Sequence, residues 1–191
     1  MRRAAAGLMA LVAMLLAGGP IKADSPRSGG YAAIELQVST LNEGRAYIIG
    51  LSGGYQNNDG TRIGLAIYDL LNGTRFPDQH PDQPARRTKM HWGGVIVAQE
   101  FAESDDWRPA VSLVLGGGDV SAYTKKKKES FDQSWYWLVQ PSVSIGYQAN
   151  DSYRPELGAG WRLPLGVDTR GTSNRLLGGP FVSFNNAFTS L

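Results

Sequence analysis

Hydrophobic and polar side chains alternate with a period of two along most of the chain from Gly30 onward. The clearest example is the segment 134–148, whose odd-numbered positions are nearly all apolar: Trp135, Trp137, Val139, Val143, Ile145 and Tyr147. Its even-numbered positions are mostly small or polar. A strand places two such classes on opposite faces, whereas a helix scatters them around its circumference. The segment therefore predicts a β-strand, and Pro141, which has no backbone donor, predicts a bulge in it.

Seven further segments show the same alternation and predict strands. They are Gly30–Val38, Arg45–Tyr55, Thr61–Leu71, Lys89–Phe101, Trp107–Tyr123, Arg154–Leu165 and Leu177–Phe188. The total of eight strands, with no segment of helical period between them, predicts an all-β fold.

The connections between these segments alternate in length. Short turns occupy 56–60, 102–106 and 149–153, and the Asp59-Gly60 pair in the first is a strong tight-turn signal. Longer polar connections occupy 72–88, 124–133 and 166–176, while 39–44 is short. An even strand number with short turns at one end and longer loops at the other is typical of bacterial outer-membrane barrels.

Aromatic side chains gather near both ends of the expected strands. Those close to the short turns are Tyr55, Phe101, Trp107, Tyr147 and Tyr153. Those near the opposite ends are Tyr68, Trp92, Tyr123, Trp135 and Trp137. Two aromatic belts separated by aliphatic residues are what the two interfaces of a bilayer select. We therefore expect an eight-stranded antiparallel transmembrane up-and-down β-barrel with its apolar face outward, rather than a soluble lipocalin-like barrel.

The first 23 residues predict a cleaved secretory signal peptide. The Arg2-Arg3 pair forms a positive n-region, residues 4–17 form an apolar run, and Ala23 ends a small-residue cleavage site. The apolar run of about 14 residues is shorter than the roughly 20 that a membrane-spanning helix needs. We expect cleavage after Ala23, a barrel domain over 24–191, and a location in the cell outer membrane.

Composition excludes several kinds of site. The chain has 19 basic and 17 acidic side chains, and removal of Arg2, Arg3 and Lys22 changes its formal charge from +2 to −1. The charge of this nearly neutral mature chain says nothing about nucleic acid, and because the sequence shows no nucleic-acid-binding module we expect no nucleic-acid partner. The absence of cysteine excludes disulfides, thiolate metal sites and a cysteine nucleophile. We expect no metal and no cofactor.

The expected inward face carries several charged side chains, namely Glu35, Arg62, Glu100, Glu156 and Arg162. The interior of an eight-stranded barrel is just wide enough for side chains to fill. These residues therefore predict an ion-pair network that plugs the lumen. An ion-conducting path is the alternative, although open diffusion pores need roughly 16–18 strands.

Two passages, 108–123 and 153–162, contain an arginine–proline pair and then run into a glycine-rich strand. With the signal peptide and the eight alternating segments, they resemble hairpins of the small outer-membrane barrels of the opacity-protein and OmpA-like transmembrane-domain class. The resemblance implies a monomer inserted by the barrel-insertion machinery, which reads a final aromatic residue. This chain ends at Leu191, and Phe188, which shares the parity of Val182 and Phe184, is the expected end of the last strand.

The expected external loops are locally basic. Their cations are Arg75, Arg86, Arg87, Lys89, Lys125, Lys126, Lys127, Lys128, Arg170 and Arg175. Lysine acts as a mobile point charge and arginine as a bidentate phosphate fork. The loops therefore predict contact with polyanions: lipopolysaccharide of the outer-membrane lipid, host glycans or surface proteins. Adhesion, surface protection or lipopolysaccharide stabilisation is the expected function, and simple solubility of a loop tip is the alternative reading of the lysine run.

An enzyme that modifies lipid A, a deacylase or acyltransferase, is the rival class. It would use His91 or His80, the two histidines of the chain. A base needs hydrogen-bond reach to its nucleophile, and only folding of the loops could bring Ser121 or Ser134 to His91. We expect no catalytic residues. His80 and its flanking aspartates could chelate a cation weakly, but a solvated loop is the simpler interpretation.

Overall fold

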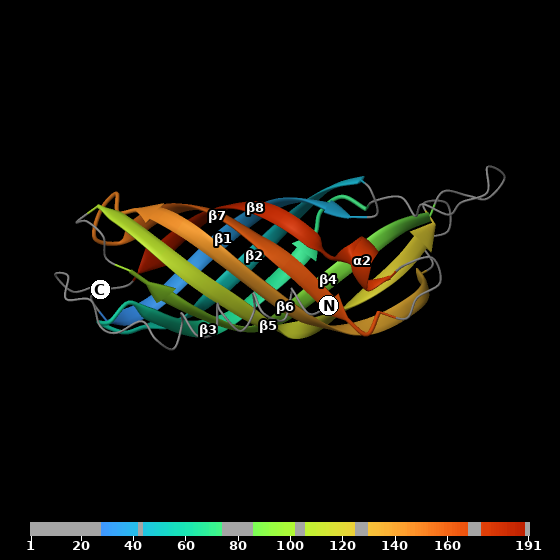
Figure 1. Ribbon diagram of the computed structural model, residues 1–191, viewed down its shortest axis with the longest axis horizontal. Coiled ribbons are helices and arrows are strands. Elements are labelled where there is room, and N and C mark those ends of the chain that lie inside the picture. Colours follow the sequence, from blue (N-terminus) through green and yellow to red (C-terminus); the bar gives the residue numbers. More distant parts are fainter. Residues whose placement is uncertain are drawn as a thin grey trace.

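The computed structural model describes residues 28–41, 44–73, 86–101, 106–124, 130–167 and 173–189. Eight strands and one short helix make up this part of the chain: β1 Gly29–Leu41, β2 Gly44–Gln56, β3 Thr61–Leu70, β4 Arg86–Glu100, β5 Trp107–Thr124, β6 Ser130–Tyr147, β7 Tyr153–Leu165, α2 Asn174–Leu177 and β8 Gly179–Thr189. Each strand is antiparallel to its sequence neighbours, and β8 pairs with β1 to close the barrel (Figure 1). The predicted eight-stranded up-and-down barrel is confirmed. The expected signal peptide lies outside the described residues.

The two ends of the barrel differ in their connections. The "turn end" carries the connections 57–60, 101–106 and 148–152, and the "loop end" carries 42–43, 71–85, 125–129 and 166–178. The predicted tight turn is present, because Gly60 has a positive φ of 77° and the Asn57 side-chain oxygen accepts hydrogen bonds from two backbone amides. In the described part of the chain, no helix is long and apolar enough to cross a membrane.

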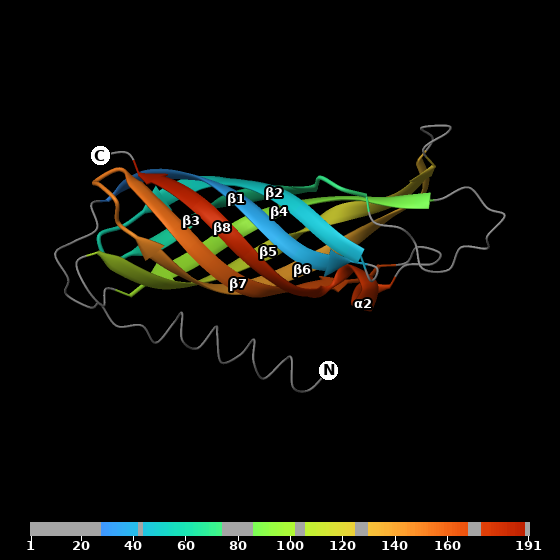
Figure 2. The same cartoon turned by 90° about the horizontal axis from the view of Figure 1, so that it is seen from above.

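At the loop end, β4, β5 and β6 extend beyond the other strands (Figure 2). The segment 124–133 was expected to be a loop, but Tyr123 pairs with Ser130 and the connection shrinks to 125–129. Beyond a bilayer both faces of a strand can be polar, so these extensions carry no hydrophobic alternation to reveal them. This correction places the expected lysine run at the tip of the longest hairpin.

The apolar face of the barrel points outward, as predicted. Trp135 and Trp137 are 61% and 66% exposed, whereas Tyr136 and Leu138, which alternate with them, are buried. Ile63, Leu65 and Ile67 on β3 repeat the pattern. Such a surface would be insoluble in water but matches the hydrocarbon band of a bilayer. The protein is therefore built as a transmembrane barrel.

The height of this apolar band can be estimated on β5. Trp107 faces outward at the turn end and Asp119 faces outward near the loop end. Twelve residue steps span about 40 Å along a strand, or about 30 Å along the axis of a barrel whose strands tilt by about 40°. That distance matches the hydrocarbon thickness of a typical bilayer, about 30 Å.

The aromatic belt at the turn end is present on the outer face. Tyr55, Trp107, Tyr147 and Phe188 are all between 42% and 52% exposed. Trp107 packs against Tyr147 with ring centroids 5.2 Å apart, and Phe188 packs against Tyr153 at 5.3 Å. Phe188 faces outward within β8, as its shared parity with Val182 and Phe184 predicted.

The prediction of a second aromatic belt, near the loop end, is partly wrong. Trp135 and Trp137 are exposed, but Tyr68 and Trp92 are only 4% and 3% exposed and stack inside the lumen with centroids 5.1 Å apart. Proximity to a strand end says nothing about the face on which a side chain lies. Strand parity does, because Tyr68 shares the parity of the buried Ala66.

The bulge predicted at Pro141 is also wrong. The β6–β7 register is the same before and after this proline, with Val139 opposite Leu163 and Ser142 opposite Gly160. The register shift recorded for β6 lies on its β5 side, between Val120 and Ala122. The proline removes one backbone donor but leaves the alternation of faces intact, so the strand continues through it.

The interior has two halves. Toward the loop end the lumen contains a cluster of buried hydrophobic side chains, and Leu177 of α2 is a completely buried member of it. The other members are Leu41, Ala46, Ile48, Ala66, Tyr68, Leu70, Met90, Trp92, Val114, Val120, Tyr136 and Leu138. Arg62, Glu100, Arg154 and Glu156 lie in the half nearer the turn end, whereas Arg162 lies beside Trp92 of the hydrophobic cluster.

Candidate functional site

The lumen near the turn end contains four buried charged side chains that form one cluster. Arg154 of β7 donates two hydrogen bonds to Glu100 of β4, from Nη1 to Oε2 at 3.0 Å and from Nη2 to Oε1 at 2.6 Å. Its Nε donates to Oε1 of Glu156 at 2.9 Å. Arg62 of β3 contacts Glu100 at 3.1 Å and Glu156 at 3.2 Å. Two guanidinium groups and two carboxylates thus join three walls of the barrel.

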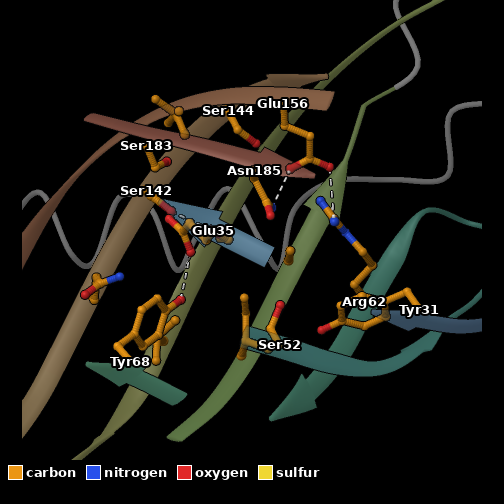
Figure 3. A pocket seen from close by; sticks show the side chains of 17 residues that line it. Tyr31, Glu35, Ser52, Arg62, Tyr68, Ser142, Ser144, Glu156, Ser183 and Asn185 are labelled. Atoms are coloured by element: carbon orange, nitrogen blue, oxygen red, sulfur yellow. Dashed lines mark hydrogen bonds and ion pairs between the residues drawn. The ribbon is translucent and has the colours of Figure 1, made fainter. Parts of the chain in front are cut away.

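The other two predicted lumen charges lie apart from this cluster. Glu35 accepts a hydrogen bond from Tyr68 at 3.0 Å (Figure 3) and another from Gln37, also at 3.0 Å. Arg162 donates to the Gln37 side-chain oxygen at 3.1 Å, and its guanidinium lies 4.9 Å from the Trp92 ring centre. The single network expected for Glu35, Arg62, Glu100, Glu156 and Arg162 is therefore divided, because these side chains enter the lumen at different heights.

Arg154 was missing from the predicted network, although it contacts both Glu100 and Glu156. Strand parity could have found it. Leu157 and Trp161 face outward on β7, so Arg154, Glu156 and Arg162 all face inward. With Arg154 included, three guanidinium groups oppose three carboxylates in the lumen. This balance removes the net charge that would otherwise be costly to bury.

A small cavity of about 40 Å³ separates the two groups of charged residues. Glu35, Ser142, Glu156 and Asn185 are among the side chains that line it (Figure 3). One water needs roughly 10–15 Å³ of such volume, so about three waters fit. Tyr31, Gln140 and Asn185 each have a buried oxygen without a protein partner at this cavity. The space suits a few hydrogen-bonded waters and is far too small for a solute.

The structure describes only some of the predicted basic residues. Arg87 and Lys89 project outward from the loop end of β4, and Arg175 is exposed on α2. Arg86 begins β4, but its side chain is not among those described. Arg75, Lys125, Lys126, Lys127, Lys128 and Arg170 lie outside the described residues.

His91, the histidine considered for catalysis, lies on the outward face of β4. Its Nε2 contacts Oδ1 of Asp119, which is directly opposite on β5. His91, Asp119 and Ser121 line one cleft on the outer surface, and Ser121 lies one outward position closer to the loop end. Within the described residues no hydrogen bond joins Ser121 to His91. His80 lies outside the described part of the chain.

Comparison with known proteins gives the same fold. No protein-family model and no curated protein sequence matches the chain. The crystal structure of Neisserial surface protein A (NspA) matches with a TM-score of 0.64 and 12% identity, over 85% of this chain and 97% of that one. The N-terminal β-barrel domain of Pseudomonas aeruginosa OprF matches with a TM-score of 0.55 and 12% identity, over 86% and 100%.

Ail, the attachment invasion locus protein of Yersinia pestis, also matches, in a crystal structure of its complex with the heparin analogue sucrose octasulfate. The TM-score is 0.50 at 7% identity, over 85% of this chain and 96% of that one. These identities are low, so the similarity concerns the fold. The protein has the architecture of the small eight-stranded outer-membrane β-barrels.

Proposed function

We propose that this protein resides in the bacterial outer membrane as a closed barrel whose basic loop end binds polyanions at the cell surface. The observation that supports this proposal most directly is the filled lumen. Two guanidinium groups and two carboxylates close the half near the turn end, and a hydrophobic cluster closed by Leu177 fills the other half. Within the described residues this arrangement supports a closed lumen, and the loop end is then the surface proposed for interaction.

The orientation follows from the connections. Outer-membrane barrels keep short turns on the periplasmic side and longer connections outside. The connections 71–85 and 166–178 are the longest, and both lie at the loop end. The loop end then faces the exterior, and the expected signal peptide supplies the export that this location requires.

The distribution of lysine gives the loop end its charge. Between residue 24 and the last residue the sequence contains five lysines, Lys89 and Lys125–Lys128, and all five belong to β4 or the β5–β6 connection at the loop end. Arg87 and Arg175 add two guanidinium groups. Sulfate and phosphate groups are suitable partners for such cations. The complex of Ail with a heparin analogue offers a precedent for polyanion binding on the same fold.

Binding of heparin tests this proposal. Changing Lys125, Lys126, Lys127 and Lys128 to glutamine should weaken binding and reduce its dependence on salt, because fewer counterions are exchanged. Arg108→Gln, at the turn end of β5, is the matched control and should leave binding unchanged. Equal heparin binding by the four-lysine variant and the parent protein would rule out the lysine run as the binding surface.

The same lysines report the orientation. A membrane-impermeant, amine-reactive reagent applied to intact cells should label lysines in the β5–β6 connection. With the opposite orientation those four lysines would face the periplasm and remain unlabelled until the outer membrane is opened. Recovery of the protein as a soluble periplasmic product would contradict the membrane location itself.

A second function, modification of lipid A, is favoured by one observation. His91 contacts Asp119 at the level where the outward face changes from apolar to polar, and Ser121 shares the cleft. A carboxylate that orients a histidine beside a hydroxyl is the arrangement of serine hydrolases. Mass spectrometry of lipid A from cells with the parent protein or with His91→Ala decides this point. A change in acyl chains that requires His91 would establish the enzyme, and identical lipid A would exclude it.

A further inference from the structure

The outward face of the barrel has a recess that crosses five strands, β2 to β6, close to the loop end. A groove of about 490 Å³ is lined by Leu51, Ile67, Gly93, Gly117 and Trp135, together with neighbouring side chains. Gly93 and Gly117 are paired in register on β4 and β5, so two adjacent outward positions have no side chain. The next outward positions toward the turn end carry large apolar residues, Val95 and Leu115.

Trp135 and Ile67 form the walls of the groove and lie close to these two glycines, which form its floor. A Cβ atom on Gly117 would lie 2.9 Å from Cζ2 of Trp135, and one on Gly93 would lie 3.2 Å from Cγ2 of Ile67. The floor is therefore narrow and apolar on both sides. This apolar lining suits a hydrocarbon chain.

A second hollow of about 550 Å³ continues the groove toward the loop end. The two share Asp69, His91 and Asp119 at their border, and the second adds Lys89 and Gln133. Asp69, His91 and Asp119 form one row across β3, β4 and β5, since each is directly opposite the next in the register. The outward positions along β4 thus run from glycine through histidine to Lys89 and Arg87.

The two aspartates of this row differ in whether their carboxylate oxygens already have partners. Asp119 contacts His91 through one carboxylate oxygen and accepts a hydrogen bond from Gln133 at 3.3 Å through the other. Both of its oxygens therefore have partners within the protein. Asp69 is exposed and can accept hydrogen bonds from a ligand, while Lys89 is an exposed cation one position farther out.

We propose that this two-part groove binds one molecule of lipid A, the acylated and phosphorylated glycolipid of the outer leaflet. One acyl chain lies in the groove between Ile67 and Trp135. Hydroxyl or amide groups near the headgroup donate to Asp69, and a phosphate is attracted to Lys89. The order of apolar floor, hydrogen-bond acceptor and cation matches the order of groups along this lipid. The inference rests on the proposed function, which places the loop end in the outer leaflet.

Filling the groove provides the first test. Ile67→Trp places a larger side chain in the groove, and Leu157→Trp on β7 is the matched control. The two positions are 61% and 60% exposed, and their strands lie on opposite sides of the eight-stranded barrel. Folding of both variants is checked by the gel shift between heated and unheated samples. Native mass spectrometry then counts lipid A molecules retained by each barrel in mild detergent.

We expect the parent protein and Leu157→Trp to retain one lipid A molecule. Ile67→Trp should retain about threefold less, because the packing energies measured in lipid are small. Excess phosphatidylglycerol, which carries a phosphate but no sugar amides, should compete poorly. Lys89→Gln should weaken retention mainly at low salt, because the attraction it removes is screened. Equal retention by Ile67→Trp and Leu157→Trp, or equal competition by phosphatidylglycerol, would overturn the groove assignment.

Heparin binding by the same variants separates this inference from the proposed function. Ile67→Trp lies below the basic loop end and should bind heparin like the parent protein. If lipid A retention is unaffected while heparin still binds, the groove assignment fails and the polyanion function remains. If heparin binding is absent from all variants while Ile67→Trp alone loses lipid A, the surface function fails and the groove assignment stands.

Discussion

Arg154 donates hydrogen bonds to both carboxylate oxygens of Glu100 from across the lumen, at 2.6 and 3.0 Å. The two residues belong to β7 and β4, which are separated by two intervening strands in the closed barrel. Paired, parallel N–H···O bonds of this kind are among the strongest that side chains form, and they fix geometry as well as charge. The contact therefore links walls of the barrel that no backbone ladder joins directly.

Removing the Arg154 side of this contact should be strongly destabilising. Arg154→Met leaves Glu100 and Glu156 buried with one shared guanidinium, that of Arg62. Loss of one partner from a buried ion pair costs about 3–5 kcal/mol. We expect urea unfolding of the barrel in detergent to shift to a lower midpoint by a corresponding amount, with Arg45→Met on the outer face of β2 as a control without effect.

The double variant distinguishes charge imbalance from lost packing. Adding Glu100→Gln to Arg154→Met restores equal numbers of positive and negative groups in the lumen and keeps an acceptor for Arg62. Much of the lost stability should return, because an unpaired buried charge is the main cost. If the double variant is less stable than Arg154→Met alone, the imbalance is not the cause.

Arg162 should tolerate the same change better. Its guanidinium lies over Trp92 and near Phe181 and makes one hydrogen bond, to Gln37, among the described residues. No carboxylate of the described residues is in direct contact with Arg162, so Arg162→Met leaves none unpaired. Methionine can also still pack on the aromatic rings. We expect a smaller loss of unfolding free energy than for Arg154→Met, measured in the same urea titration. A larger loss would mean that Arg162 stabilises Glu35 through Gln37 more strongly than the contacts suggest.

Much of the fold could be predicted because a membrane barrel sorts residues by a strict period of two. The apolar positions of 134–148 and the short turns located the strands and the outer face. Two predictions failed. The ends of β5 and β6 beyond the membrane were missed because they lack hydrophobic alternation. Tyr68 and Trp92 were assigned to the wrong face because they were judged by their closeness to a strand end. Parity within each strand corrects the second error but not the first.

The candidate sites were harder to predict. Inward charges could be found strand by strand, but their heights in the barrel depend on the stagger of the register, which the sequence pattern does not provide. That is why Glu35 and Arg62 were grouped although they lie in separate clusters. The outer groove was not predicted for a related reason: Gly93 and Gly117 are far apart in sequence and become one floor only when β4 and β5 pair.

Leu177 closes the hydrophobic half of the lumen, so its truncation should leave a cavity. It is completely buried, whereas Leu176 beside it in α2 is partly exposed. Deleting a buried leucine side chain to alanine costs about 2–5 kcal/mol. We expect Leu177→Ala to lower the urea midpoint clearly and Leu176→Ala to lower it much less. Equal effects of the two substitutions would contradict the position of α2 over the lumen.

Tryptophan quenching tests which aromatic rings face the bilayer. Single-tryptophan variants that retain only Trp92 or only Trp137 are reconstituted into vesicles of lipids with brominated acyl chains. Trp137 is 66% exposed on the outer face and should be quenched, whereas Trp92 is 3% exposed and stacked on Tyr68, so its emission should persist. Bromine quenches only on close approach, and the barrel wall separates Trp92 from the chains. Strong quenching of Trp92 together with weak quenching of Trp137 would invert the two faces, and a soluble barrel with an apolar interior would then be the correct fold.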